Sequence, residues 1–128
     1  RYEGLTKQFG VSICIDETTA DYVEQFMPKD EARVRRMARV RPAGMDTPLT
    51  VYQLLPAVKN DPTVSDEMIA RYEEGINAVL DGKWSDAVEL LSEFGDFDGP
   101  SKFVMNQMKL TNFEVPADWD GAFTLKKK

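Results

Sequence analysis

The chain has 128 residues, of which 42% are hydrophobic and 30% charged, as expected for one folded globular domain. Its 16 lysines and arginines face 22 aspartates and glutamates, so the net charge is −6 and the basic excess of nucleic-acid-binding proteins is missing. With no histidine and a single cysteine, Cys14, the sequence excludes an internal disulfide, a Cys/His zinc site and a Ser–His or Cys–His nucleophile.

The N-terminal residues predict a helix, a strand and a second helix. Residues 1–10 place apolar side chains at helical spacing, and Gly10 suits the left-handed backbone at a helix end. Residues 11–15 alternate apolar with small polar side chains, which predicts a half-buried strand. In this strand we expect Cys14 to be a small buried side chain rather than a reactive thiol. Asp16 is the expected N-cap of the short helix that follows.

Two further strands are expected to form a β-hairpin. Residues 33–41 and 49–55 have strand character, and the turn-rich residues 42–48 connect them. The period of two in the first strand predicts an apolar face made of Val34, Ala38 and Val40. It predicts an opposite, arginine-rich face made of Arg33, Arg35, Met37, Arg39 and Arg41. We expect this second face to be solvated or to protect a sheet edge, with phosphate binding as the alternative.

Helices dominate the remaining sequence. Residues 64–80 repeat apolar side chains at helical spacing, with Thr63 as the expected N-cap and Asp81–Gly82 as the end. A second helix over residues 84–94 completes a helical hairpin with a very short turn. A third short helix is expected to begin near Asp98. The irregular tail that follows has apolar anchors at Trp119, Phe123 and Leu125.

The helical hairpin has the spacing of one tetratricopeptide repeat. The residues that carry this spacing are Gly75, Ala78, Gly82, Trp84, Ala87 and Leu91. Because one such unit cannot bury its own apolar face, we expect the hairpin to pack on the α/β part of the chain, with a peptide-binding scaffold as the alternative. The expected fold class is therefore α+β, with a strand, a helix and a β-hairpin in residues 1–56 and a helical hairpin, a short third helix and an irregular tail in residues 57–128.

Two segments of the N-terminal half carry a longer pattern, RYEGLTKQFGVSICIDETTADYV and RVRRMARVRPAGMDTPLTVYQLL. The residues that fit this pattern are Arg1, Glu3, Gly4, Leu5, Gly10, Val11, Gly44, Pro48, Val51, Tyr52 and Leu54. In their order and spacing, residues 1–56 resemble the C-terminal part of the catalytic domain of bacterial class III adenylate and guanylate cyclases, which is a partial ferredoxin-like sheet. The stretch from Tyr72 to PADWDGAFTL is similar to the tail of bacterial members of this class. Because the chain begins at Arg1 inside a helical pattern, we expect it to be a piece of a longer protein.

The resemblance implies a nucleotide cyclase that makes cyclic AMP or cyclic GMP, in which the ribose 3′-hydroxyl attacks the α-phosphate of the nucleoside triphosphate and pyrophosphate leaves. Two Mg or Mn ions held by two aspartates activate the attacking oxygen, and the site forms between the two subunits of a homodimer. An asparagine positions the ribose and an arginine stabilises the transition state. Such proteins often carry an extracytoplasmic sensor and membrane spans upstream, which implies that this part lies on the cytoplasmic side of a membrane-anchored parent.

Arg1 matches the transition-state arginine of the family, and its guanidinium suits that role because it binds phosphate oxygens in a bidentate way. The asparagine and both metal-binding aspartates of the family would precede Arg1, so we expect this chain alone to bind no metal and to be inactive. The hairpin turn has Ala43 and Met45 where the family often has lysines, which leaves Arg39 or Arg41 as alternative phosphate contacts. The remaining acidic residues of interest are expected to cap helices or form turns, namely Asp16, Glu17, Asp21, Asp96 and Asp98.

Three functions are consistent with these features. The first is the C-terminal part of a catalytically active cyclase, and the second is a cyclase-like regulatory domain without catalysis, with which the altered turn agrees. The third is a helical protein-interaction module supported by the α/β half. We expect a nucleoside triphosphate and a second subunit as partners of the parent protein, and no nucleic acid.

Overall fold

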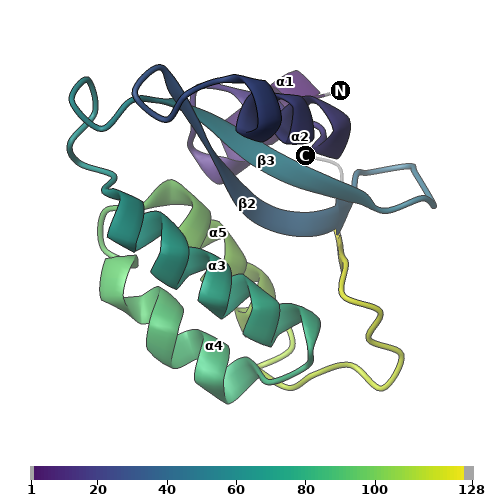
Figure 1. Cartoon of the computed structure of the whole chain (residues 1–128). Coiled ribbons are helices and arrows are strands. Elements are labelled where there is room, and N and C mark those ends of the chain that lie inside the picture. The colour runs from purple at the N-terminus through teal and green to yellow at the C-terminus, as the bar shows by residue number, and fades with distance from the viewer. Residues whose placement is uncertain (1, 126–128) are drawn as a thin grey trace.

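The computed structural model describes residues 2–125, which form an α+β fold with a four-stranded mixed sheet and five α-helices (Figure 1). The helices are α1 (Tyr2–Phe9), α2 (Glu17–Phe26), α3 (Asp66–Leu80), α4 (Trp84–Leu91) and α5 (Gly99–Lys109), with a 3₁₀ turn over Ser92–Phe94. The strands are β1 (Cys14–Ile15), β2 (Ala32–Arg41), β3 (Leu49–Pro56) and β4 (Phe123–Thr124). The sheet order is β1-β3-β2-β4, with β3 antiparallel to β1 and β2 and with β4 parallel to β2. The expected β-hairpin and helical hairpin are both present.

Side chains cap the starts of α2, α3 and α5; the predicted cap at Asp16 is confirmed, and Asp98, predicted near a helix start, is the cap of α5. Asp16 accepts a hydrogen bond of 2.8 Å from a backbone N–H in the first turn of α2, and Asp98 does the same for α5 at 3.1 Å. The predicted cap at Thr63 is wrong, because α3 begins later and Ser65 accepts the capping bond at 3.1 Å. The Thr63 hydroxyl donates instead to the side chain of Asp61.

The first strand is shorter than predicted. Residues 11–15 were expected to form it, but only Cys14 and Ile15 pair with β3. Ile13, expected on the buried face, is 46% exposed, whereas Cys14 is buried, as expected. The Ile13 carbonyl still accepts a hydrogen bond of 3.1 Å from the Leu54 N–H of β3, so the chain is extended here before it enters α2.

Strand β2 contains a bulge that the alternation of the sequence does not reveal. Arg36 pairs with Tyr52 and Ala38 with the next residue of β3, so Met37 is the extra residue. As a result, Met37 and Ala38 both contribute to the same core, although neighbouring strand residues normally point to opposite faces. The predicted apolar face of Val34, Ala38 and Val40 is therefore wrong, because Val34 lies before the bulge and packs on the other side of the sheet.

The two faces of the sheet bury two unequal cores. The smaller core lies under α2, where Ala20 and Val23 pack against Val34 of β2. The larger core joins the sheet to α1, α3, α4, α5 and the tail, and it includes Phe9, Cys14, Val40, Tyr72, Trp84, Leu91, Val104 and Phe123. In Figure 1, α2 covers one face of the sheet and α3, α4 and α5 lie against the other. The apolar side of the helical hairpin thus packs toward the sheet.

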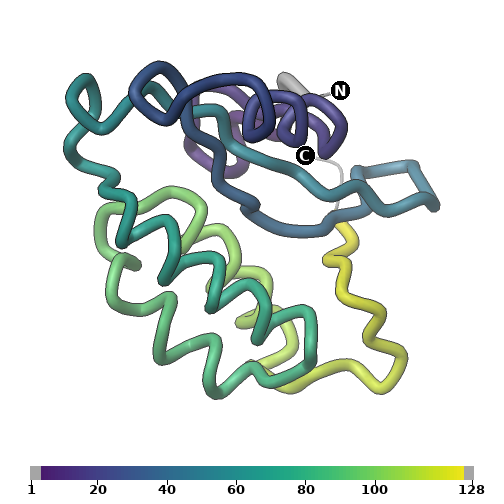
Figure 2. The backbone as a smooth tube through the Cα atoms, in the orientation of Figure 1, coloured from purple at the N-terminus to yellow at the C-terminus, as the bar shows by residue number. Residues whose placement is uncertain are grey.

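The tail after α5 passes the C-terminal end of α3 and returns to the sheet (Figure 2). Trp119 packs edge-on against Trp84, and its indole N–H donates a hydrogen bond of 3.0 Å to the Val79 carbonyl at the end of α3. The following residues form β4, whose Phe123 pairs with Val40 of β2. The predicted anchors are buried or half-buried, but the short strand was not predicted.

Candidate functional site

Arg1, for which the resemblance to cyclases implies a catalytic role, lies outside the described residues. The turn predicted near the nucleotide, residues 42–48, projects beyond the body of the molecule (Figure 1). Gly44 in this turn has φ +80°, a backbone conformation that favours glycine. Ala43 and Met45 flank it, so the turn offers backbone groups rather than a lysine charge.

The two arginines suggested as substitutes differ in their surroundings. Arg41 is half-buried and forms an ion pair with Asp120 of the tail, and its Nε donates a hydrogen bond of 3.2 Å to the Asp46 carbonyl. Arg39 is exposed on the same side of the hairpin. Of these two arginines, therefore, Arg41 is bound to Asp120 of the tail and Arg39 faces solvent.

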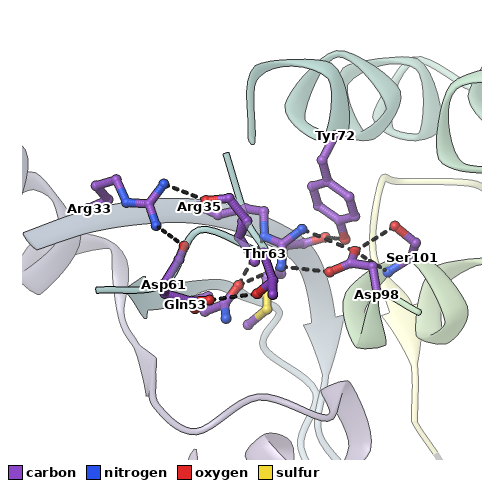
Figure 3. A network of polar contacts seen from close by, with 10 residues as sticks. Arg33, Arg35, Gln53, Asp61, Thr63, Tyr72, Asp98 and Ser101 are labelled. Atoms are coloured by element: carbon purple, nitrogen blue, oxygen red, sulfur yellow. Dashed lines mark hydrogen bonds and ion pairs between the residues drawn. The ribbon is translucent and has the colours of Figure 1, made fainter. Parts of the chain in front are cut away.

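The prediction of a solvated arginine face is wrong for the first half of β2. The bulge and the helical layer enclose Arg33 and Arg35, which are only 5% and 1% exposed. The Arg33 guanidinium donates 2.7–2.8 Å hydrogen bonds to the carbonyls of Val64 and Pro56. It also forms a 3.0 Å ion pair with Asp66. These contacts attach the connector that leads into α3 to the edge of the sheet, and Figure 3 shows a further contact from Arg33 to the Asp61 carbonyl in this connector.

Arg35 is the centre of a buried polar network (Figure 3). Its two terminal nitrogens form a bidentate ion pair with Asp98, and both N–O distances are 3.0 Å. The side-chain carbonyl of Gln53, the cross-strand neighbour, accepts from Nε at 2.9 Å and from a terminal nitrogen at 2.6 Å. Asp98 also accepts from the Ser101 hydroxyl at 2.6 Å. The guanidinium carbon lies 4.8 Å from the centre of the Tyr72 ring, within the range of a cation–π contact.

This network has the properties of a structural element rather than of a ligand site. Asp98 is 5% exposed and Ser101 is fully buried, so a substrate has no access to them. Tyr72 donates its hydroxyl to the Met37 carbonyl at 2.6 Å, and burial raises the pKa of that hydroxyl well above its usual range. Because the groups already have partners, they connect β2, β3, α3 and α5 and are not set up for proton transfer.

Asp16 and Asp98, two of the acidic residues expected to cap helices or form turns, cap α2 and α5. Hydrogen bonds from Thr19 lower the pKa of Asp16, in agreement with its role as a helix cap. Within residues 2–125, no group of three or more histidine, cysteine, aspartate and glutamate side chains is arranged to hold a metal ion. Burial raises the pKa of the Cys14 thiol to about 11, so it remains protonated and unreactive at neutral pH.

Sequence reasoning missed the pairing of Arg35 with Asp98, which are 63 residues apart. It assigned Asp98 correctly to a helix start, but the alternation of β2 placed Arg35 on a surface. One signal was present, because Arg35 lies in a strand that continues directly into the apolar pair Met37 and Ala38. A buried arginine requires an acid, and Asp98 begins the helix that covers it.

Comparison of the chain with protein-family models, with curated proteins and with solved structures gives no match. Among the described helices, none combines the length and the apolar character that crossing a membrane requires.

Proposed function

We propose that this chain is the C-terminal part of a class III nucleotide cyclase, which converts a nucleoside triphosphate to a cyclic nucleotide and pyrophosphate in signal transduction. The proposal rests on the two segments that resemble this family and on the order of elements that these segments form. A helix end with Gly10 at φ +70°, a strand, a helix and an antiparallel hairpin follow one another along residues 2–56.

The observation that carries the proposal furthest is the open side of β1. This strand pairs with β3 on one side, and among the described residues no strand pairs with its other side. Ile13 beside it is 46% exposed, although the alternation of residues 11–15 predicts it on the buried face of a half-buried strand. The unpaired backbone groups of such an edge can pair with another strand. In the proposed parent, this strand belongs to the catalytic half that bears the metal-binding aspartates.

In the proposed enzyme, this chain supplies one catalytic residue, and the rest of the site comes from elsewhere. Arg1 stabilises the negative charge that develops on the α-phosphate as the ribose 3′-oxygen attacks and pyrophosphate departs. The metal ions, Mg or Mn, and the asparagine that orients the ribose come from residues that precede Arg1, and the second subunit completes the site. The parent is membrane-anchored through upstream segments, with this part on the cytoplasmic side.

A cyclase-like regulatory domain without catalysis is the second candidate, and one observation favours it. The hairpin turn has no lysine at positions 43 and 45, and Arg41 is engaged by Asp120. A regulatory domain would retain the sheet and the dimer contact but would not turn over nucleotide.

The test compares the present chain with the same chain extended upstream in its parent protein, each incubated with ATP or GTP and Mg or Mn ions. We expect no cyclic nucleotide from the 128-residue chain and turnover from the extended one. Replacing Arg1→Ala in the extended protein should lower kcat by about 100- to 1,000-fold, and Arg1→Lys by less. Turnover by the short chain, or an upstream sequence without the two aspartates, would contradict the catalytic proposal, and the latter would support the regulatory one.

A further inference from the structure

The outer edge of β2 carries backbone groups that point away from β3. The Leu54 N–H donates to Ile13, so Leu54 directs its hydrogen-bonding groups to β1. Its partner in the register is Val34, and the two therefore form a non-hydrogen-bonded pair of the antiparallel ladder. By alternation, the N–H and C=O groups of Ala32, Val34 and Arg36 all face the outer edge.

Contacts on both sides of Val34 confirm this direction. The Ala32 N–H donates to the Pro28 carbonyl at 3.1 Å, and the Arg36 N–H donates to the Glu73 carboxylate at 2.8 Å. Between these two occupied positions, the N–H and C=O groups of Val34 have no hydrogen-bond partner among residues 2–125. The edge therefore has one donor and one acceptor that an added strand could use.

A cleft of about 230 Å³ runs along this part of the edge, between α2 and α3. One wall comes from the end of α2 and the other from the first half of α3, with β2 as the floor. The residues that line the walls include Val23, Glu24 and Met27 on α2 and Ile69, Ala70 and Glu73 on α3. Each wall thus offers apolar side chains together with a carboxylate.

The charge of the cleft indicates what kind of segment fits. Arg33 and Asp66 on its lining pair with each other, which leaves Glu24 and Glu73 against Lys29. The remaining charge is negative, so a lysine or arginine in the occupant would be attracted. The occupant must also be narrow and extended, because helices flank the edge on both sides.

We infer that this cleft binds an extended peptide segment of a partner protein, added as a strand beside β2. The segment carries small or branched apolar side chains and at least one lysine or arginine, and it pairs with Val34 through its backbone. The same edge already accepts an extended segment further along, where β4 pairs with Val40 and Arg41. The inference is independent of the cyclase proposal, since it uses neither Arg1 nor a nucleotide.

The test uses the whole chain and a synthetic peptide with the order lysine, valine, threonine, valine, lysine, which spans the stretch from Ala32 to Arg36 at about 3.3 Å per residue. Titration is followed by the backbone amide signals in a two-dimensional ¹⁵N NMR spectrum. We expect saturable binding that shifts the Val34 amide. A peptide of the same sequence with N-methyl groups on alternate amides, which cannot pair as a strand, should bind at least about tenfold more weakly.

Two variants test the role of charge. Glu24→Lys reverses a charge on the cleft wall and should weaken binding several-fold, whereas Glu89→Lys makes the same change on the exposed surface of α4 and should leave it unchanged. Both positions are exposed, so we expect both variants to fold, and the amide spectrum of each variant checks this. The inference is overturned if the peptide does not bind, if the Val34 amide does not shift, or if the N-methylated peptide binds equally well. It is also overturned if the free chain is a dimer that protects the Val34 amide, because a second copy would then be the occupant.

Discussion

Arg35 lies almost fully inside the protein, where an unpaired charge would cost several kcal/mol. Asp98 neutralises it with two parallel hydrogen bonds, and Gln53 and Ser101 satisfy further polar groups of the pair. Replacing such a pair by apolar residues is often harmless, but removing one partner leaves a buried charge without compensation. The network therefore specifies how α5 docks on the sheet more than it adds to net stability.

Substitution of Asp98→Asn should lower the free energy of unfolding by about 3–5 kcal/mol, because asparagine retains the ability to cap α5 but leaves the Arg35 charge unpaired. Urea unfolding followed by tryptophan fluorescence measures this change. The control is Glu93→Gln, which breaks the ion pair with Arg71 between two exposed side chains and should move the midpoint very little. If both variants lowered the free energy of unfolding by the same small amount, the buried Arg35–Asp98 pair would contribute no more to stability than an exposed ion pair.

Single residues were predictable where the reason for their identity is local. Asp16 and Asp98 bond to backbone groups three residues away, and Gly10 provides the left-handed conformation at a helix end, all of which sequence spacing indicates. The cap at Ser65 was missed because Thr63 and Ser65 are both good capping residues, and local chemistry does not decide between them. Contacts of Arg33 with the α3 connector decide where that helix starts.

At the scale of elements, the helices and the β-hairpin follow from periodicity, but the bulge at Met37 does not. The run of alternating residues in β2 continues through the bulge without interruption, so a period of two predicts an unbroken strand. Only the tertiary contacts fix the extra residue, since Glu73 binds the Arg36 N–H and Tyr72 binds the Met37 carbonyl. The alternation correctly placed Arg33, Arg35 and Met37 on one face, but it does not reveal that the α3 connector and α5 cover this face.

The close packing of α3 on α4 depends on a glycine. A Cβ atom added at Gly75 would lie 2.8 Å from Cδ2 and 3.0 Å from Cγ of Leu91, which is fully buried and cannot move aside freely. Gly75→Ala should therefore destabilise the protein by about 1–3 kcal/mol, despite the higher helix propensity of alanine. Thermal unfolding followed by circular dichroism measures the loss.

Gly4 in α1 provides the matched control, because a Cβ atom there would meet nothing within 4 Å. Gly4→Ala should stabilise the protein by about 0.5–1 kcal/mol, because the higher helix propensity of alanine is the only effect expected at this position. If both substitutions raised the melting temperature, the two helices would not be in the close contact described here.

At the scale of the whole molecule, the larger core draws residues from both the N-terminal and the C-terminal half of the sequence. Cys14 of β1, Val40 of β2, Tyr72 of α3 and Phe123 of β4 all belong to the larger core. The tail adds a second connection, because Trp119 bonds to the end of α3 shortly before β4 joins the sheet. A pairing between a two-residue strand and a strand more than 80 positions away leaves no trace in local sequence, which explains why the tail was predicted to be irregular.

Because the larger core joins the sheet to the helices, we expect residues 2–125 to unfold in one cooperative transition. Two natural probes report on its two sides. Trp84 and Trp119 report on the helices and the tail through their fluorescence, and the Cys14 thiol reports on the sheet through its rate of alkylation. In the native protein, burial and a pKa raised to about 11 protect this thiol, and both effects are lost on unfolding.

The experiment follows tryptophan fluorescence and a short pulse of iodoacetamide at each urea concentration, with the chain in high urea as the end point for alkylation. The two transitions should share one midpoint and one slope, because opening the sheet removes the surface on which the helices pack. Alkylation of Cys14 at a lower urea concentration than the fluorescence change would mean that the sheet opens while the helices remain folded. Residues 1–56 and 57–128 would then be separate folding units, and the shared core would contribute much less to stability than its burial suggests.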